Sequence, residues 1–182
     1  MFQGWENFYL MIGSAAGALI GLLFVVVTLT SGMERDRALR ASALYMTPTV
    51  VMFSTVLVVG ALATAPGLGA QVHGVLIGIM ALAGLIYGTR ITLTMYERRK
   101  ESSHWTDFWC YGVAPAALFA GLGVAIALTW VAPAAAPDAV AADLIVMLLM
   151  GVRNAWDLIT WIAPQREALV AATAPKKPEE PA

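Results

Sequence analysis

Apolar residues run through this chain in five long segments, which short polar connections separate. The segments cover roughly residues 8–30, 43–65, 72–95, 108–131 and 140–163. An α-helix needs about 20 apolar residues to cross the hydrocarbon core of a bilayer, and each segment has about that length. The pattern therefore predicts an all-α fold, a five-transmembrane-helix bundle. We expect one domain over residues 1–170, followed by a disordered tail over residues 171–182 that is rich in proline and charge.

Outside the apolar segments, which contain Arg90 and Arg153, lysine and arginine occur only in alternate connections. Three arginines lie in the first connection, three basic residues follow the third segment, and three more lie in the tail. None occurs in the connections on the other side, which are residues 1–7, 65–72 and 132–139. Basic residues concentrate on the cytoplasmic side of membrane proteins. The asymmetry predicts an outside N-terminus and a cytoplasmic C-terminus.

Composition agrees with a membrane protein. The chain has 182 residues, of which 59% are hydrophobic and only 13% are charged, whereas about 25% are charged in a typical soluble domain. The net charge of −1 argues against nucleic acid as a partner. The single cysteine, Cys110, excludes an intrachain disulfide and a thiolate metal cage. It lies in an apolar run, where a cysteine behaves as a small apolar residue.

The last apolar segment also carries polar residues. Arg153, Asp157 and Thr160 fall on one face of a helix, with Asn154 beside them. Because a charge at membrane depth is costly, we expect this face to turn away from lipid. Arg153 and Asp157 are four residues apart and can pair within the helix. Two interpretations stay open, an ion pair that fixes packing and a site for a proton, an ion or a lipid headgroup.

Two further charged residues are predicted at the cytoplasmic half of the bundle. Arg90 lies near the cytoplasmic end of the third segment, and Asp107 opens the fourth. In a compact bundle Arg90 can pair with Asp107 or Asp157, which makes an intramembrane polar cluster with Arg153 and Asn154. The simpler interpretations are that Arg90 extends its long side chain to the interface and that Asp107 is an acidic residue at a helix N-terminus.

Glycines recur at intervals of four in two segments. The first segment has Gly13, Gly17 and Gly21, and the third has Gly74 and Gly78. This spacing stacks the glycines on one helix face and lets another backbone approach closely. It predicts helix packing, against either this chain or a second copy. Pro48 and Pro115 lie within predicted helices, where proline removes a backbone hydrogen bond and tends to produce a kink.

Residues that could carry catalysis are sparse. The sequence holds neither a zinc-protease helix motif, nor a nucleophile elbow, nor a phosphate-binding loop. His73 and His104 lie on opposite membrane faces in the predicted topology and cannot share a metal. Asp143 and Asp157 are about 21 Å apart along one helix, too far for a carboxylate pair. We expect no enzyme activity, no cofactor and no metal site.

One tract resembles a known group of proteins. Gly151-Val-Arg-Asn-Ala-Trp-Asp157 is similar to the last-helix motif of a family of small, uncharacterised bacterial inner-membrane proteins. Asn7-Phe-Tyr-Leu-Met-Ile-Gly-Ser-Ala-Ala-Gly-Ala-Leu-Ile-Gly-Leu-Leu-Phe24 resembles their first helix. In that family a histidine often precedes the Asn-Ala-Trp-Asp tract, where this chain has Arg153, which argues against a role that depends on histidine. The resemblance implies a multi-pass protein of the bacterial inner membrane and no particular activity.

Two functions from different classes fit these observations. The first is a non-enzymatic accessory or scaffold protein that packs into a homo-oligomer or a larger membrane complex. The second is a small oligomeric channel or proton-coupled or ion-coupled transporter that uses Arg153 and Asp157. The predicted partners are the lipid bilayer, other copies or other membrane proteins, and anionic lipid headgroups.

Overall fold

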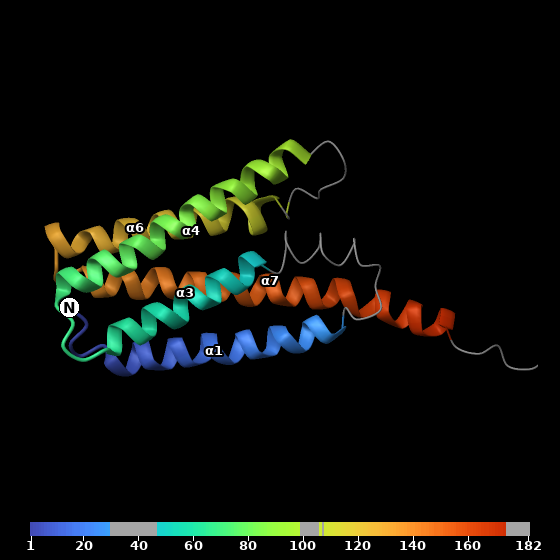
Figure 1. The fold of residues 1–182 in the computed structure, drawn as a ribbon, viewed down its shortest axis with the longest axis horizontal. Coiled ribbons are helices and arrows are strands. Elements are labelled where there is room, and N and C mark those ends of the chain that lie inside the picture. The colour runs from blue at the N-terminus through green and yellow to red at the C-terminus, as the bar shows by residue number, and fades with distance from the viewer. Residues whose placement is uncertain (30–46, 99–105, 107, 174–182) are drawn as a thin grey trace, which may run out of the picture.

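A computed structural model describes residues 1–29, 47–98, 106 and 108–173 of the chain (Figure 1). These residues form six helical elements, which follow one another along the chain. They are α1 (Glu6–Leu29), α3 (Thr47–Thr64), α4 (Ala70–Arg98), the π-helix η3 (Phe108–Val113), α6 (Ala114–Val131) and α7 (Ala136–Thr173). The described residues thus have an all-helical fold, and five of their helical stretches are long and apolar enough to cross a membrane.

The helices coincide with the predicted apolar segments to within a few residues. The fourth segment is built from two elements, η3 and α6, which follow each other without a break. Residues 43–46 of the second predicted segment lie outside the described residues, as do Asp107 and His104.

The last helix is longer than its apolar segment. α7 continues through Pro164 and ends at Thr173, three residues inside the predicted tail. Residues 174–182 lie outside the described part. Its last ten residues include Gln, Arg, Glu, Leu and three Ala. These residues have high helix propensity, which explains why the helix continues beyond the apolar stretch.

The helices form two antiparallel pairs with α7 between them (Figure 1). α1 packs mainly on α3, and α4 packs mainly on α6, while α7 contacts α1, α3, α6 and η3. The core along these contacts consists of fully buried apolar side chains, among them Met52, Val56, Val59, Leu122, Leu144 and Met147. α7 is therefore the element that joins the two pairs.

A hydrogen bond ties the start of α7 to α1. The Tyr9 side chain has no exposed surface, and its hydroxyl donates to the backbone oxygen of Pro137 over 2.8 Å. Phe2 packs edge-on against the Tyr9 ring, with 4.7 Å between the ring centroids. A buried hydroxyl needs a hydrogen-bond partner. The backbone oxygens in the first turn of α7 point along that helix, and the Tyr9 hydroxyl reaches one of them. The Tyr9 contact therefore selects one position of α1 along α7.

Glycine permits the close approach of α1 and α3. A Cβ atom at Gly60 would lie only 2.7 Å from the backbone oxygen of Tyr9 and 3.0 Å from the Cα of Gly13. At Gly13 a Cβ would lie 3.5 Å from the Cα of Gly60, and at Gly17 it would lie 3.6 Å from the side chain of Leu57. Among the residues that the structure describes, no atom of another helix lies within 4 Å of such a Cβ at Gly21. The contact between these helices thus uses Gly13 and Gly17 and leaves Gly21 open.

The two glycines predicted for the third segment face α6. A Cβ at Gly74 would lie 2.6 Å from the Trp130 ring, and one at Gly78 would lie 4.0 Å from Ile126. Two more glycines of α4 also lie against α6. Gly84 lies against the Phe119 ring, and a Cβ at Gly88 would lie 3.0 Å from the backbone of Ala116. The small residues of α4 therefore pack within this chain.

We predict that Gly60→Ala destabilises the protein, because the added methyl group cannot fit between α1 and α3 without separating them. Overpacking of this kind costs about 1–3 kcal/mol, which exceeds the gain of roughly 0.5–1 kcal/mol that alanine brings to a helix. Thermal unfolding in detergent, followed by circular dichroism, measures the loss. Gly21→Ala is the matched control and is expected to be neutral or slightly stabilising. Equal unfolding temperatures for the two variants would show that the α1–α3 contact does not depend on Gly60.

Candidate functional site: a polar cluster between α7 and the π-helix

The candidate site lies where α7 meets η3, and proline explains the local geometry there. Pro115 occupies the first turn of α6, directly after the π-helix. Proline has no backbone N–H and its ring collides with the carbonyl four residues earlier, here that of Tyr111. A π-helix has wider turns, with bonds between residues five apart, and it relieves this collision. Because Pro115 has no N–H, the backbone oxygen five residues earlier, that of Cys110, has no donor from the π-helix at this position and requires one from elsewhere.

Asn154 supplies this donor. Its side chain has no exposed surface, and its Nδ2 donates to the backbone oxygen of Cys110 over 3.0 Å. The other side of the amide is also used, because Asn154 Oδ1 accepts a hydrogen bond from Arg153 Nη1 over 3.1 Å. A buried amide is tolerated only when its donors and acceptors are paired. Asn154 thus joins the π-helix to the central helix.

Tyr111 makes the reciprocal contact from the π-helix to α7. Only 2% of its surface is exposed. Its hydroxyl lies 2.9 Å from the backbone oxygen of Asn154 and 3.2 Å from Asp157 Oδ2, and it donates to both. Since a hydroxyl carries a single proton, the two oxygens share it. Cys110, Tyr111, Arg153, Asn154 and Asp157 form what we call the polar cluster.

The two charges predicted to pair have different partners. Arg153 is exposed and donates to Asn154, whereas Asp157 is half-buried and accepts from Tyr111. Thr160 is exposed and donates to the backbone oxygen of Asp157. The predicted polar face of α7 is therefore divided, with Asn154 and Asp157 toward the π-helix and Arg153 toward the outside of the bundle.

The other predicted members of the cluster do not join it within the described residues. Arg90 is exposed on α4, and its backbone oxygen accepts a hydrogen bond from Thr94. Asp107 lies outside the described residues.

The whole tract from Gly151 to Asp157 has a packing role in this geometry. Gly151 is buried against the Phe53 ring of α3, and a Cβ there would collide with the ring. Asn154 and Asp157 hold the π-helix, while Trp156 is 69% exposed on the opposite side. Two neighbouring turns of one helix therefore contact α3 and η3 at nearly the same level.

Two functional features were missed from sequence. Tyr111 was not singled out, although its position four residues before Pro115 indicated a backbone oxygen in need of rearrangement. His73 was considered only as a metal ligand, but it is 3% exposed in the first turn of α4. Its ring nitrogens lie 2.9 Å from the backbone oxygen of Leu62 and 3.1 Å from that of Gly69, so His73 fastens the turn between α3 and α4.

Asp143 is the second unusual polar residue of α7. A Cβ at Gly121 of α6 would lie 2.6 Å from Asp143 Oδ1, so only glycine leaves room for the carboxyl group. The second carboxyl oxygen, Oδ2, is buried and has no hydrogen-bond partner in the described part of the chain, and the same holds for the Tyr87 hydroxyl.

The polar groups of the cluster form hydrogen bonds with one another and with the backbone of η3 and α7. Across the described ranges, no three His, Cys, Asp or Glu side chains gather in a way that could hold a metal ion. The cluster can hold a strained segment in place, and Arg153 can offer a positive charge at the surface.

Comparison with known proteins gives no further guidance. No family model, no curated protein and no solved structure matches this chain. The interpretation of the site therefore depends on its geometry.

We predict that Asn154→Leu, which keeps the side-chain volume, destabilises the protein by about 1–3 kcal/mol. The substitution leaves the buried oxygen of Cys110 without its donor and removes the acceptor of Arg153. Chemical unfolding of the purified protein in detergent measures the difference. Thr160→Val serves as the control, since this exposed residue bonds only within its own helix, and it should change stability by less than about 0.5 kcal/mol. If both variants unfold at the same denaturant concentration, the amide is not a structural requirement.

Proposed function

We propose that the protein is a non-enzymatic accessory or scaffold protein of the bacterial inner membrane, where it spans the bilayer five times. The five apolar helices support the membrane location, and the distribution of lysine and arginine supports an outside N-terminus and a cytoplasmic C-terminus. A membrane-impermeant thiol reagent tests this orientation in intact cells. A cysteine placed at Gln3 should react and one placed at Lys177 should not.

The observation that carries the proposal is the hydrogen bonding of the polar cluster. An intramembrane ionisable residue is a candidate for a transport pathway by default. Here, however, the side chains of Asn154 and Asp157 form hydrogen bonds with the π-helix of the same chain. Residues that hold a structural segment at rest are poorly suited to release it in every transport cycle. The cluster is thus better suited to architecture than to carrying ions.

The surface of the bundle supports assembly with other membrane-embedded chains. A groove of about 570 Å³ runs between α4 and α6. Its lining combines large exposed side chains, such as Ile79 and Val124, with small ones, such as Gly78, Ala120 and Gly123. Small residues allow helices to approach closely within a membrane, and their association there is driven by packing. The groove suits a helix of a second copy.

A channel or transporter is the second candidate, and Asp143 is the observation that favours it. One carboxyl oxygen of this residue is buried without a partner among the described residues, and the residue lies within an apolar helix. Carboxyl groups in such positions can take up and release protons. In an oligomer, Asp143 could line a path for protons that does not include the residues of the polar cluster.

Proton and ion flux across liposomes that contain the purified protein tests the two candidates. The accessory role predicts no flux above empty liposomes for the intact oligomer, and copurification with other membrane proteins. Flux that Asp143→Asn abolishes in a folded protein, while Asp157→Asn leaves it intact, would instead establish transport through Asp143. Flux lost in Asp157→Asn alone, with stability unchanged, would contradict the structural role of the polar cluster.

A further inference from the structure

The carboxyl group of Asp143 occupies a space on α6 that only glycine leaves open. A Cβ atom at Gly121 would lie 2.6 Å from Asp143 Oδ1 and 3.7 Å from its Cγ, so the carboxyl group takes the place of the missing side chain. The other oxygen, Oδ2, is buried and bonds to no polar atom among the described residues. We call this space the Asp143 niche.

The neighbouring side chains of α7 show that the niche borders the core. Val140 and Met147 lie three positions before and four positions after Asp143, on the same side of the helix, and both are fully buried. Asp143 also lies within the apolar stretch Ala136–Thr160, on the order of 10 Å from its start at 1.5 Å per residue. In a bilayer this position is inside the membrane, where an uncompensated charge is costly.

No positive charge faces the niche from the elements that pack on α7. The helices α3 and α6 contain no titratable side chain. Those of α1 and η3 lie near the two ends of their contacts with α7, and they are Glu6, Tyr9, Cys110 and Tyr111. On α7 itself, the nearest ionisable residues are Asp138 and Arg153, roughly 8 Å and 15 Å from Asp143 along the axis. A negative charge in the niche would therefore have no counter-charge.

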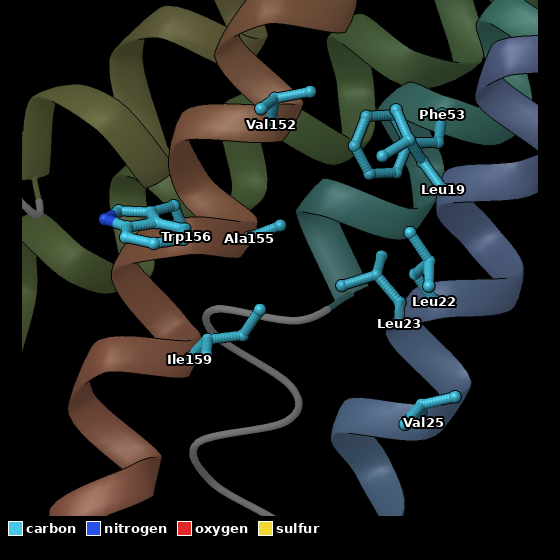
Figure 2. Close-up of a pocket in the computed structure, with 9 residues that line it drawn as sticks. All are labelled: Leu19, Leu22, Leu23, Val25, Phe53, Val152, Ala155, Trp156 and Ile159. Carbon is cyan, nitrogen blue, oxygen red and sulfur yellow. The ribbon is translucent and has the colours of Figure 1, made fainter.

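The niche suits a proton better than a metal cation. Hard cations take about six oxygen ligands, whereas the niche offers one carboxyl group, and across the described ranges no three His, Cys, Asp or Glu side chains gather around an ion. Asp143 lines neither the groove between α4 and α6 nor the pocket between α1, α3 and α7, which is shown in Figure 2. Neither lining contains a charged side chain.

We propose that Asp143 is a proton-binding site, and that α6 and α7 stay in contact at Gly121 only while the proton is bound. A carboxylate that loses water without gaining a donor or a positive neighbour takes up a proton instead. When the proton leaves, the charged group has to move out of the niche toward water, and the contact at Gly121 is lost. The inference rests on the membrane insertion in the proposed function, and it applies to an accessory protein as well as to a transporter.

Infrared difference spectroscopy of the protein in liposomes detects the bound proton directly. The C=O stretching band of a protonated carboxyl group should be present in the wild type at neutral pH, should be absent from Asp143→Asn, and should disappear as the pH is raised. Asp157→Asn, which changes another carboxyl group of the same helix, is the matched control and should keep the Asp143 band. A wild-type spectrum without a band that Asp143→Asn removes would overturn the proposal.

Hydrogen exchange of α6, followed by mass spectrometry, tests the contact between the helices. Asp143→Asn is the reference, because an amide has the shape of a neutral carboxyl group and does not ionise, so its exchange shows only the intrinsic effect of pH. Around Gly121 the two proteins should exchange alike at mildly acidic pH, and the wild type should exchange several-fold faster at alkaline pH. The same pH dependence in both proteins would show that the contact does not depend on the proton.

Two glycine variants test the niche itself. Gly121→Ala should displace the carboxyl group and speed the exchange of α6 at every pH. Gly123→Ala is the control, because its Cβ would lie 3.9 Å from that of Ala81, which is an ordinary contact. If Gly121→Ala keeps the wild-type band and exchange, the proton is not held in this niche.

The two proposals fail on different results. Proton flux through Asp143 would contradict the accessory role and would leave the proton site intact, whereas a missing carboxyl band contradicts the proton site alone. A protein that leaves the membrane without detergent would refute the membrane insertion on which both proposals rest.

Discussion

The structure depends on two hydrogen bonds between α7 and η3: the Asn154 side chain donates to the Cys110 carbonyl, and the Tyr111 hydroxyl donates to the Asn154 backbone oxygen. Among apolar helices no water replaces a lost backbone hydrogen bond, so each carbonyl that proline releases needs a donor from the protein. Pro115 creates this need at the start of α6, and the amide on α7 meets it for the π-helix. The central helix is thereby joined to the α4–α6 pair, while Gly151 against Phe53 joins it to α3 at nearly the same level.

The helical architecture was predictable because membrane-length helices follow from local composition. Each of the five segments is apolar over about 20 residues, and neither packing nor long-range contacts are needed to recognise it. The helix boundaries were less predictable, since α7 continues to Thr173 through residues of lower hydrophobicity. Gly13 and Gly17 were expected to face a helix, and the sequence left the partner open. The structure places them against α3 of the same chain, whereas an added Cβ at Gly21 would meet no atom of another helix within 4 Å among the described residues.

Three residues of the candidate site could be singled out from the sequence, but their contacts could not. Arg153, Asn154 and Asp157 stand out because polar groups are costly in an apolar helix. Asn154 and Asp157 bond to residues more than 40 positions away, and helix periodicity carries no information about such distances. The i, i+4 spacing favoured a pair between Arg153 and Asp157, but the Tyr111 hydroxyl competes for the carboxylate and the Asn154 amide competes for the guanidinium. The π-helix itself was not foreseen, because its single sequence indication, Pro115, is equally consistent with a simple kink.

A double-mutant cycle between Tyr111→Phe and Asp157→Asn tests the central claim most directly, because each change alters one partner of the same hydrogen bond. Unfolding free energies of the wild type, both single variants and the double variant give the coupling energy. If the cluster is structural, the coupling should lie between about 0.5 and 3 kcal/mol, and the loss in the double variant should be smaller than the sum of the single losses. Additive losses, with a coupling near zero, would contradict the account and would leave Asp157 free for another role.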